Sequence, residues 1–131
     1  INKYKLNSIF AHETNKLATK LSDEGDLITS LSGGNQQKIL IGRSFAERPS
    51  ILVLNDPARG IDVGAKAEVY RILNNFAQDG GTILLASTEL PELLALSNRI
   101  AVFYVCVLHK IFDGEVHDEK LVMAAMTGTQ M

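Results

Sequence analysis

The stretch LSGGNQQK, at residues 31–38, places two adjacent glycines at the start of a predicted helix. Ser32 is a residue type that caps helices, and Gly33 and Gly34 allow the backbone to approach a ligand closely. Free main-chain N–H groups and the positive end of a helix dipole favour a phosphate at such a place. The same letters also fit an ordinary capped helix after a Gly-Gly turn, so this stretch leaves both interpretations open.

A second informative stretch, ILVLNDPARGID, follows at residues 51–62. Its continuous apolar run, residues 51–54, is typical of a strand that is buried on both faces, as in a parallel sheet. Asn55 and Asp56 come directly after this run. They therefore place polar side chains at the carboxyl end of a sheet, where open α/β folds bind ligands.

Outward from these stretches, helical and strand-like patterns alternate along the chain, which favours an α/β fold. Hydrophobic spacing and helix-stop signals predict helices at residues 1–21, 33–48 and 65–78, a short helix after Pro91, and a last helix through Met126 that Asp118 caps. Strands are predicted at residues 51–54, 82–86, 100–104 and 107–112.

The composition excludes several classes of protein. The 13 basic and 15 acidic residues give a net charge of -2, which argues against a nucleic-acid binder. Cys106 is the single cysteine, so an internal disulfide framework is excluded, and its apolar surroundings predict a small core residue. His12, His109 and His117 are scattered without metal-ligand spacing.

Taken together, the two stretches resemble the ATP-binding-cassette (ABC) family: the first matches its LSGGQ signature, and the second matches its Walker B segment followed by its D-loop. The NQQK and RGID forms look like the second cassette of sugar or nucleoside importers, in which two cassettes share one polypeptide. The resemblance implies a partial P-loop NTPase fold, with a mainly parallel sheet flanked by helices. It assigns residues 1–30 to the end of a helical subdomain and residues 31–131 to the signature helix and the C-terminal part of the ATPase core.

In this family two cassettes hold two ATP molecules head to tail, so each signature faces the ATP of the other cassette. The resemblance implies that Ser32, Gly33 and Gly34 contact the γ-phosphate of an ATP on a partner cassette. Gln36 is expected beside them. Arg59 and the D-loop residue Asp62 are also kept, so the parts offered to a partner are intact.

The parts that would serve this cassette's own ATP depart from the family pattern. No G-x-x-x-x-G-K-[ST] motif occurs, so the Walker A strand and loop are missing from these residues. Asn55 replaces the Walker B aspartate that organises Mg²⁺, Asp56 replaces the catalytic glutamate, and Thr88 replaces the switch histidine. Asn55 also fits a neutral substitution in which Mg²⁺ is held through other groups.

We therefore expect a fragment of the ATP-binding subunit of an importer for sugars or related solutes, peripheral to the cytoplasmic face of the membrane. ATP and Mg²⁺ belong to the full assembly, and we expect neither tight ATP binding nor hydrolysis by this chain alone. The expected partners are another cassette and transmembrane permease subunits. A second copy of the chain is a further candidate partner, since a sheet cut at this place exposes an edge.

Two alternative functions remain open at this point. One is a non-transport ABC-type ATPase, such as a DNA-repair or chromosome-structure head, although those continue into coiled coil and no long heptad flanks occur here. The other is an interaction module that nucleotide merely holds together.

The sequence also departs from the family between the last two predicted strands. Val105 and Cys106 stand where the family has a Glu-Gly turn, and a β-branched residue disfavours the positive φ of a tight hairpin. Either the two strands run into each other, or the turn moves toward His109 and Lys110.

Overall fold

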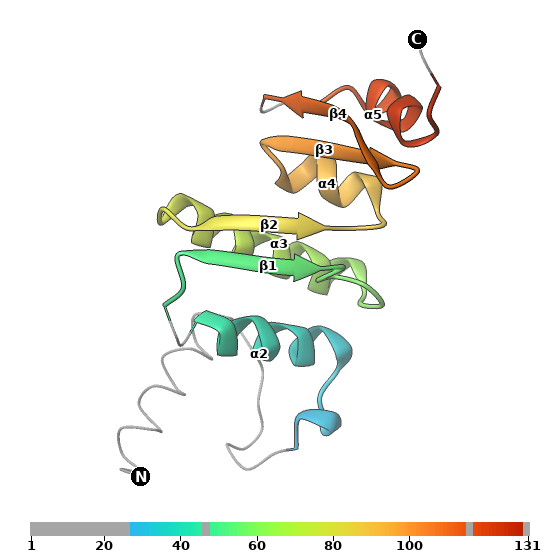
Figure 1. Cartoon of the computed structure of the whole chain (residues 1–131). Helices are drawn as coiled ribbons and strands as arrows, with labels where there is room; N and C mark the ends of the chain where they lie inside the picture. Colours follow the sequence, from blue (N-terminus) through green and yellow to red (C-terminus); the bar gives the residue numbers. More distant parts are fainter. Residues whose placement is uncertain (1–26, 46–47, 115–116, 130–131) are drawn as a thin grey trace. The chain divides into compact units, whose positions relative to one another are not determined.

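The computed structural model describes residues 27–45, 48–114 and 117–129 (Figure 1). The helix predicted at residues 1–21, and nearly all of the segment assigned to a helical subdomain, lie outside these ranges. In chain order the elements are η1 (Ile28–Ser30), α2 (Gly33–Phe45), β1 (Ile51–Asn55), α3 (Val63–Gln78), β2 (Thr82–Ala86), α4 (Leu90–Leu96), β3 (Arg99–Tyr104), β4 (Val107–Asp113) and α5 (Glu119–Met126). They form two compact units, Ile1–Leu84 and Leu85–Met131, and each is described by itself.

The first unit is built around a parallel pair of strands, β1 and β2, which α3 connects (Figure 1). The main-chain N–H of Thr82 donates to the carbonyl of Ser50 over 2.9 Å, which ties the start of β2 to the start of β1. Parallel strands need a crossover connection, and an α-helix usually supplies it. The α/β fold with a parallel sheet that the sequence predicts is thereby confirmed.

One face of this sheet is exposed, so the prediction that β1 is buried on both faces is wrong. Leu52 is 6% exposed, whereas its neighbour Val53 is 72% exposed. Ile51 and Leu84 are also exposed. Successive side chains of a strand point to opposite faces, and the apolar core of the unit lies on one side only, around Val69, Ile72 and Leu73 of α3.

In the second unit, α5 packs on the antiparallel hairpin of β3 and β4, and α4 packs against α5. Because side chains alternate along β3, Ile100 and Val102 point into a core. Leu90 of α4 and Val122 and Ala125 of α5 complete this core. Asp118 caps α5 as the sequence predicts. Its Oδ1 accepts from the main-chain N–H of Lys120 over 2.8 Å and from that of Leu121 over 3.3 Å.

The turn between β3 and β4 is a two-residue turn at Val105 and Cys106, so neither of the two arrangements expected from the sequence is found. Tyr104 pairs with Val107 across the turn. The φ angles of Val105 and Cys106 are 48° and 60°, the sign that a type I′ turn requires at both positions. A register shift lies between Val102 and Phe103 of β3, away from the turn.

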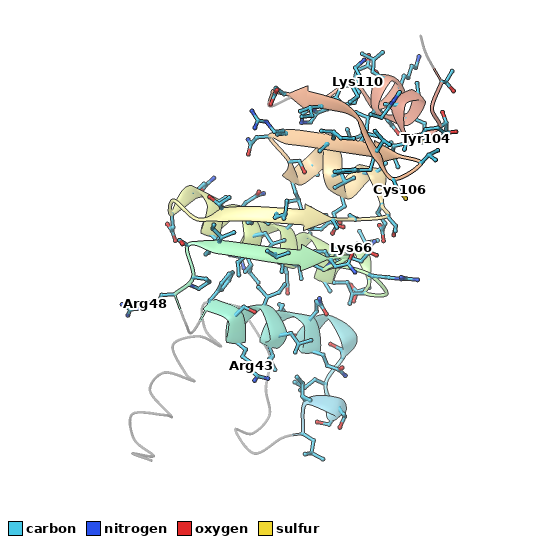
Figure 2. The ribbon with its side chains drawn as sticks, in the orientation of Figure 1. Arg43, Arg48, Lys66, Tyr104, Cys106 and Lys110 are labelled. Carbon is cyan, nitrogen blue, oxygen red and sulfur yellow. The ribbon has the colours of Figure 1, made fainter. Side chains whose placement is uncertain are left out.

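Cys106 is exposed, which corrects the prediction that it is a small core residue. Figure 2 shows it at the tip of the hairpin, beyond the end of β3 that carries Tyr104. The apolar run around it had indicated burial. A run in a hairpin tip contacts few other elements, however, so hydrophobicity along the chain did not determine burial there.

Replacing Val105 and Cys106 together by Asn and Gly is expected to stabilise the chain by roughly 1 kcal/mol, because these residues accept positive φ with less strain. Urea unfolding followed by circular dichroism measures the change. The control is Val107→Thr, an exposed strand position next to the turn with an expected effect within about 0.5 kcal/mol. An Asn-Gly variant no more stable than the parent would contradict a strained turn.

Candidate functional site

The signature segment forms the first turn of α2. The carbonyl of Ser32 accepts from the N–H of Gln36 over 2.9 Å, which starts the helical hydrogen bonding. The side chain of Gln36 turns back, and its Nε2 donates to the carbonyl of Leu31 over 2.7 Å. Ser32 and Gly33 are exposed, whereas Gly34 is buried. Gln36 therefore fastens the segment to its own helix, and Ser32 and Gly33 are the signature residues that face solvent.

The two signature glycines lie against the D-loop side of the unit. A Cβ on Gly33 would lie 3.6 Å from Cγ2 of Ile61, which is ordinary contact. A Cβ on Gly34 would lie only 2.4 Å from the Cβ of Ala65 in α3. Glycine is thus required at position 34 by the close approach of α2 and α3. The predicted contact of Gly34 with a phosphate stays a prediction.

The D-loop ends in the N-cap of α3. Oδ1 of Asp62 accepts from the main-chain N–H of Ala65 over 2.9 Å, and its carbonyl accepts from the N–H of Lys66 over 2.9 Å. This cap explains why α3 begins at Val63, two residues earlier than predicted. Figure 2 shows Lys66 at the end of α3 that lies beside the carboxyl end of β1.

The carboxyl end of β1 carries the two predicted Walker B positions. Asn55 is exposed at the last strand position, and Asp56 follows with a φ of 44°. The side chain of Asp56 is only 14% exposed, and its Oδ2 lies 3.9 Å from Nη1 of Arg59. A non-glycine residue at positive φ is strained, and such strain persists only where the surroundings enforce it. Arg59 therefore partly balances the charge of the carboxylate that the sequence assigned to catalysis.

Thr88 belongs to the second unit, so it is described apart from the residues above. It is exposed, in the connection between β2 and α4. Beside it, Oγ of Ser87 accepts from the main-chain N–H of Glu89 over 3.0 Å, which bends the chain into α4. A threonine hydroxyl in this turn offers a hydrogen bond, but it lacks the titration near neutral pH that an imidazole provides.

Sequence reasoning missed an ion pair next to the signature in which the lysine is buried and the glutamate is half-exposed. Nζ of Lys38, in α2, lies 2.6 Å from Oε2 of Glu68 in α3. The available signal was spacing, since Lys38 is four residues after Gly34 and therefore lies on the same face of the helix. Glu92 of α4 was also missed. It is buried, and its Oε1 has no hydrogen-bond partner among the residues that the structure describes.

The described histidines have structural surroundings. His117 places Nε2 2.9 Å from the carbonyl of Ser97, and the His109 ring lies 6.1 Å from the ring of Tyr104. His12 lies outside the described residues. Within the described ranges no three His, Cys, Asp or Glu side chains gather as a metal site would require. No helix in those ranges combines the length and apolar character needed to cross a membrane.

Asp62→Ala is expected to cost about 1 kcal/mol, because the first turn of α3 loses the acceptor for the N–H of Ala65. Urea unfolding gives the free energy, and amide hydrogen exchange at Ala65 and Lys66 reports the local effect. Asp62→Asn is the matched control, since asparagine caps equally well. Equal stability of the alanine and asparagine variants would show that the cap contributes little.

No known family profile matches the chain, but individual relatives do. The ribose import ATP-binding protein of Halalkalibacterium halodurans is 41% identical over 128 residues, which are 98% of this chain and 26% of the relative. The galactose/methyl galactoside import ATP-binding protein of Treponema pallidum is 40% identical over 123 residues, or 94% of this chain and 25% of the relative. The chain thus spans about a quarter of the length of these relatives.

Solved structures agree at the level of the fold. A dimeric ATP-binding cassette in a post-hydrolysis state, bound to ADP and Pi, matches with a TM-score of 0.75 and 17% identity, over 86% of this chain and 49% of that one. The ADP conformation of another ABC transporter cassette matches with a TM-score of 0.69 and 20% identity, over 88% of this chain and 44% of that one. In sequence and in fold, the chain corresponds to a segment of an ABC ATPase cassette, and ribose and galactose import ATP-binding proteins are among its relatives.

Proposed function

We propose that the chain is part of the ATP-binding subunit of an importer for sugars of the ribose or galactose kind. In this proposal it supplies its signature to an ATP on a partner cassette, while its own nucleotide site is degenerate. The observation that carries the proposal is an asymmetry within the first unit. Ser32 and Gly33 stand exposed beside an intact, capped D-loop, whereas the positions that would serve its own Mg²⁺ and water are altered.

The signature end is suited to an anion. The first N–H groups of α2 have no partner within the helix, and the helix dipole adds positive potential there. The exposed hydroxyl of Ser32 adds a donor at the same place. A Cβ on Gly33 would lie 3.6 Å from Cγ2 of Ile61, so the D-loop lies next to this end of α2. A γ-phosphate held by another cassette would therefore meet both segments together.

The residues of this cassette's own site support binding more than hydrolysis. The amide of Asn55 is a neutral ligand, weaker than a carboxylate for the hard cation Mg²⁺. Asp56 keeps a carboxylate but is one methylene shorter than glutamate and lies near Arg59. A misplacement of about 1 Å costs on the order of a hundredfold in rate. Thr88 replaces a titrating imidazole, so the site loses a proton-linked contact to the γ-phosphate.

The remaining parts of the proposal follow from the relatives. Their printed names describe import ATP-binding proteins, so we place the assembly at the cytoplasmic face of the membrane with permease subunits. ATP and Mg²⁺ would be bound in the assembly, with the partner cassette supplying the ATP-holding loop. Residues 1–30 would end a helical subdomain, and residues 31–131 would form the signature helix and the C-terminal part of the core.

The test uses a hybrid in which this chain replaces the matching 128-residue segment of the Halalkalibacterium halodurans relative. Ser32→Glu places a negative charge where the γ-phosphate is expected, and acidic residues are tolerated at helix N-termini, so folding is preserved. We expect the ATPase rate of the assembled transporter to fall by roughly a hundredfold.

The matched control is Ser44→Glu, which makes the same exposed substitution at the other end of α2. Its ATPase rate should equal that of the unsubstituted hybrid. If the Ser32 and Ser44 variants hydrolyse ATP equally fast, the signature does not serve an ATP site, and the proposal fails.

A second substitution separates a static from a hydrolytic role of the chain's own site. Asp56→Asn removes the carboxylate while keeping the size of the side chain. We expect the ATPase rate of the hybrid assembly to remain unchanged, because the active site would draw its catalytic groups from the partner cassette. A rate that collapses in the Asp56 variant would show that this site hydrolyses ATP itself.

A further inference from the structure

Helices α2 and α3 lie side by side and run in the same direction, so their first turns are at the same end of the unit (Figure 1). Three matched contacts define this alignment. Gly34 faces Ala65 in the first turns, Lys38 pairs with Glu68 one turn later, and the rings of Phe45 and Phe76 stack at 5.2 Å near the other end. The signature and the D-loop are thus the two neighbouring ends of one helix pair.

The middle contact differs from the other two, because it is charged and directional. The Lys38 side chain is 4% exposed, and its Nζ lies 2.6 Å from Oε2 of Glu68, whose side chain is 46% exposed. A buried ammonium loses much of its hydration, and a hydrogen-bonded carboxylate compensates only at the right place. The pair therefore penalises any shift that separates the two atoms.

The apolar contacts constrain the alignment by shape alone and supply no directional bond. Gly34 and Ala65 meet closely, because a Cβ on Gly34 would lie 2.4 Å from the Cβ of Ala65, but neither residue offers its neighbour a polar side-chain partner. Buried polar groups are known to fix the register of packed helices, because a different register breaks the contact between them. One helical turn is about 5.4 Å, so a slip of that size would separate the signature from the D-loop by much more than a hydrogen bond tolerates.

We propose that the Lys38–Glu68 ion pair sets the register of α2 against α3, and so holds the signature and the D-loop in one fixed arrangement. Lys38 and Glu68 are then positioning residues, which act on an ATP of the partner cassette through Ser32, Gly33 and Asp62. The register itself is a property of this chain. Its consequence for ATP rests on the proposed function.

The register is measured by pulsed electron–electron double resonance on the chain itself. Nitroxide labels go on cysteines at Arg43 of α2 and Val63 of α3, both exposed, with Cys106→Ser removing the native thiol. Figure 2 shows Arg43 on the side of α2 away from β1. The helix rise and the usual spacing of packed helices place their Cα atoms roughly 20 Å apart.

We expect one narrow distance in the parent. Lys38→Met and Glu68→Gln should each broaden it, or add a second distance shifted by about one turn, about 5 Å. The charge swap Lys38→Glu with Glu68→Lys should restore the narrow distance. Arg71→Met, which removes an exposed cation of α3 and leaves Lys38 and Glu68 in place, is the control and should leave the distance unchanged.

The proposal is overturned if both single variants keep the parent's narrow distance, or if the swap fails to restore it. Glu68→Gln keeps the experiment decisive should Lys38→Met not fold, because the half-exposed Glu68 side chain tolerates a neutral replacement of equal size.

The consequence for ATP is read from the same hybrid transporter. Lys38→Met should lower kcat at least about tenfold through misplacement of the signature. KM for ATP should stay unchanged, because the nucleotide is held by the partner cassette, and the charge swap should recover most of the rate. An unaltered kcat beside a broadened distance would refute the positioning role. If Ser32→Glu leaves the ATPase rate unchanged while Lys38→Met broadens the distance, only the proposed function is refuted.

Discussion

Gly34 occupies the point where α2 and α3 come closest, and the geometry of the first unit depends on the absence of a side chain there. A Cβ at that position would lie 2.4 Å from the Cβ of Ala65, so any other residue would push the two helices apart. Ala65 is also the residue whose N–H is capped by Asp62. The signature therefore approaches α3 at the residue whose N–H is capped by the D-loop residue Asp62, within the first turns of both helices.

This arrangement changes the physical meaning of the glycine pair. Glycines before a helix are usually explained by the close approach of a phosphate. Here the two glycines have different roles. Gly33 is exposed and leaves its backbone accessible, whereas Gly34 is buried and allows the close packing of α2 against α3. Gln36 adds rigidity by bonding back to the carbonyl of Leu31. The segment is thus held in place by its own residues before any ligand arrives.

The second unit shows how tertiary pairing overrides local preference. Val105 has a φ of 48°, which its branched side chain disfavours, yet the strands on both sides are paired up to the turn. The strand register buries Ile100, Val102 and Val122 in the core beneath the hairpin, and full burial of such a side chain contributes about 1.5–3 kcal/mol. The strain is confined to two exposed residues at the tip.

The sequence by itself determined the order of the main helices and strands, the parallel sheet that contains β1, and the cap at Asp118. These features depend on local periodicity, on residue types that terminate helices and on hydrogen bonds between residues close in sequence, so neighbouring residues are enough to determine them. The family resemblance likewise located Ser32, Asn55, Asp56 and Thr88. Their roles toward ATP remain predictions, because a nucleotide and a partner cassette act on them from outside the chain.

The tertiary structure alone decided which faces are buried and which side chains meet. The exposure of Val53, the exposure of Cys106 and the pairing of Lys38 with Glu68 all depend on residues far apart in the sequence. An apolar run predicts a strand, but only the elements packed against it determine whether one face or both are covered. From the sequence alone, a lysine after the signature is expected to be a solvated charge. In the structure, a second helix places a carboxylate 2.6 Å from its Nζ.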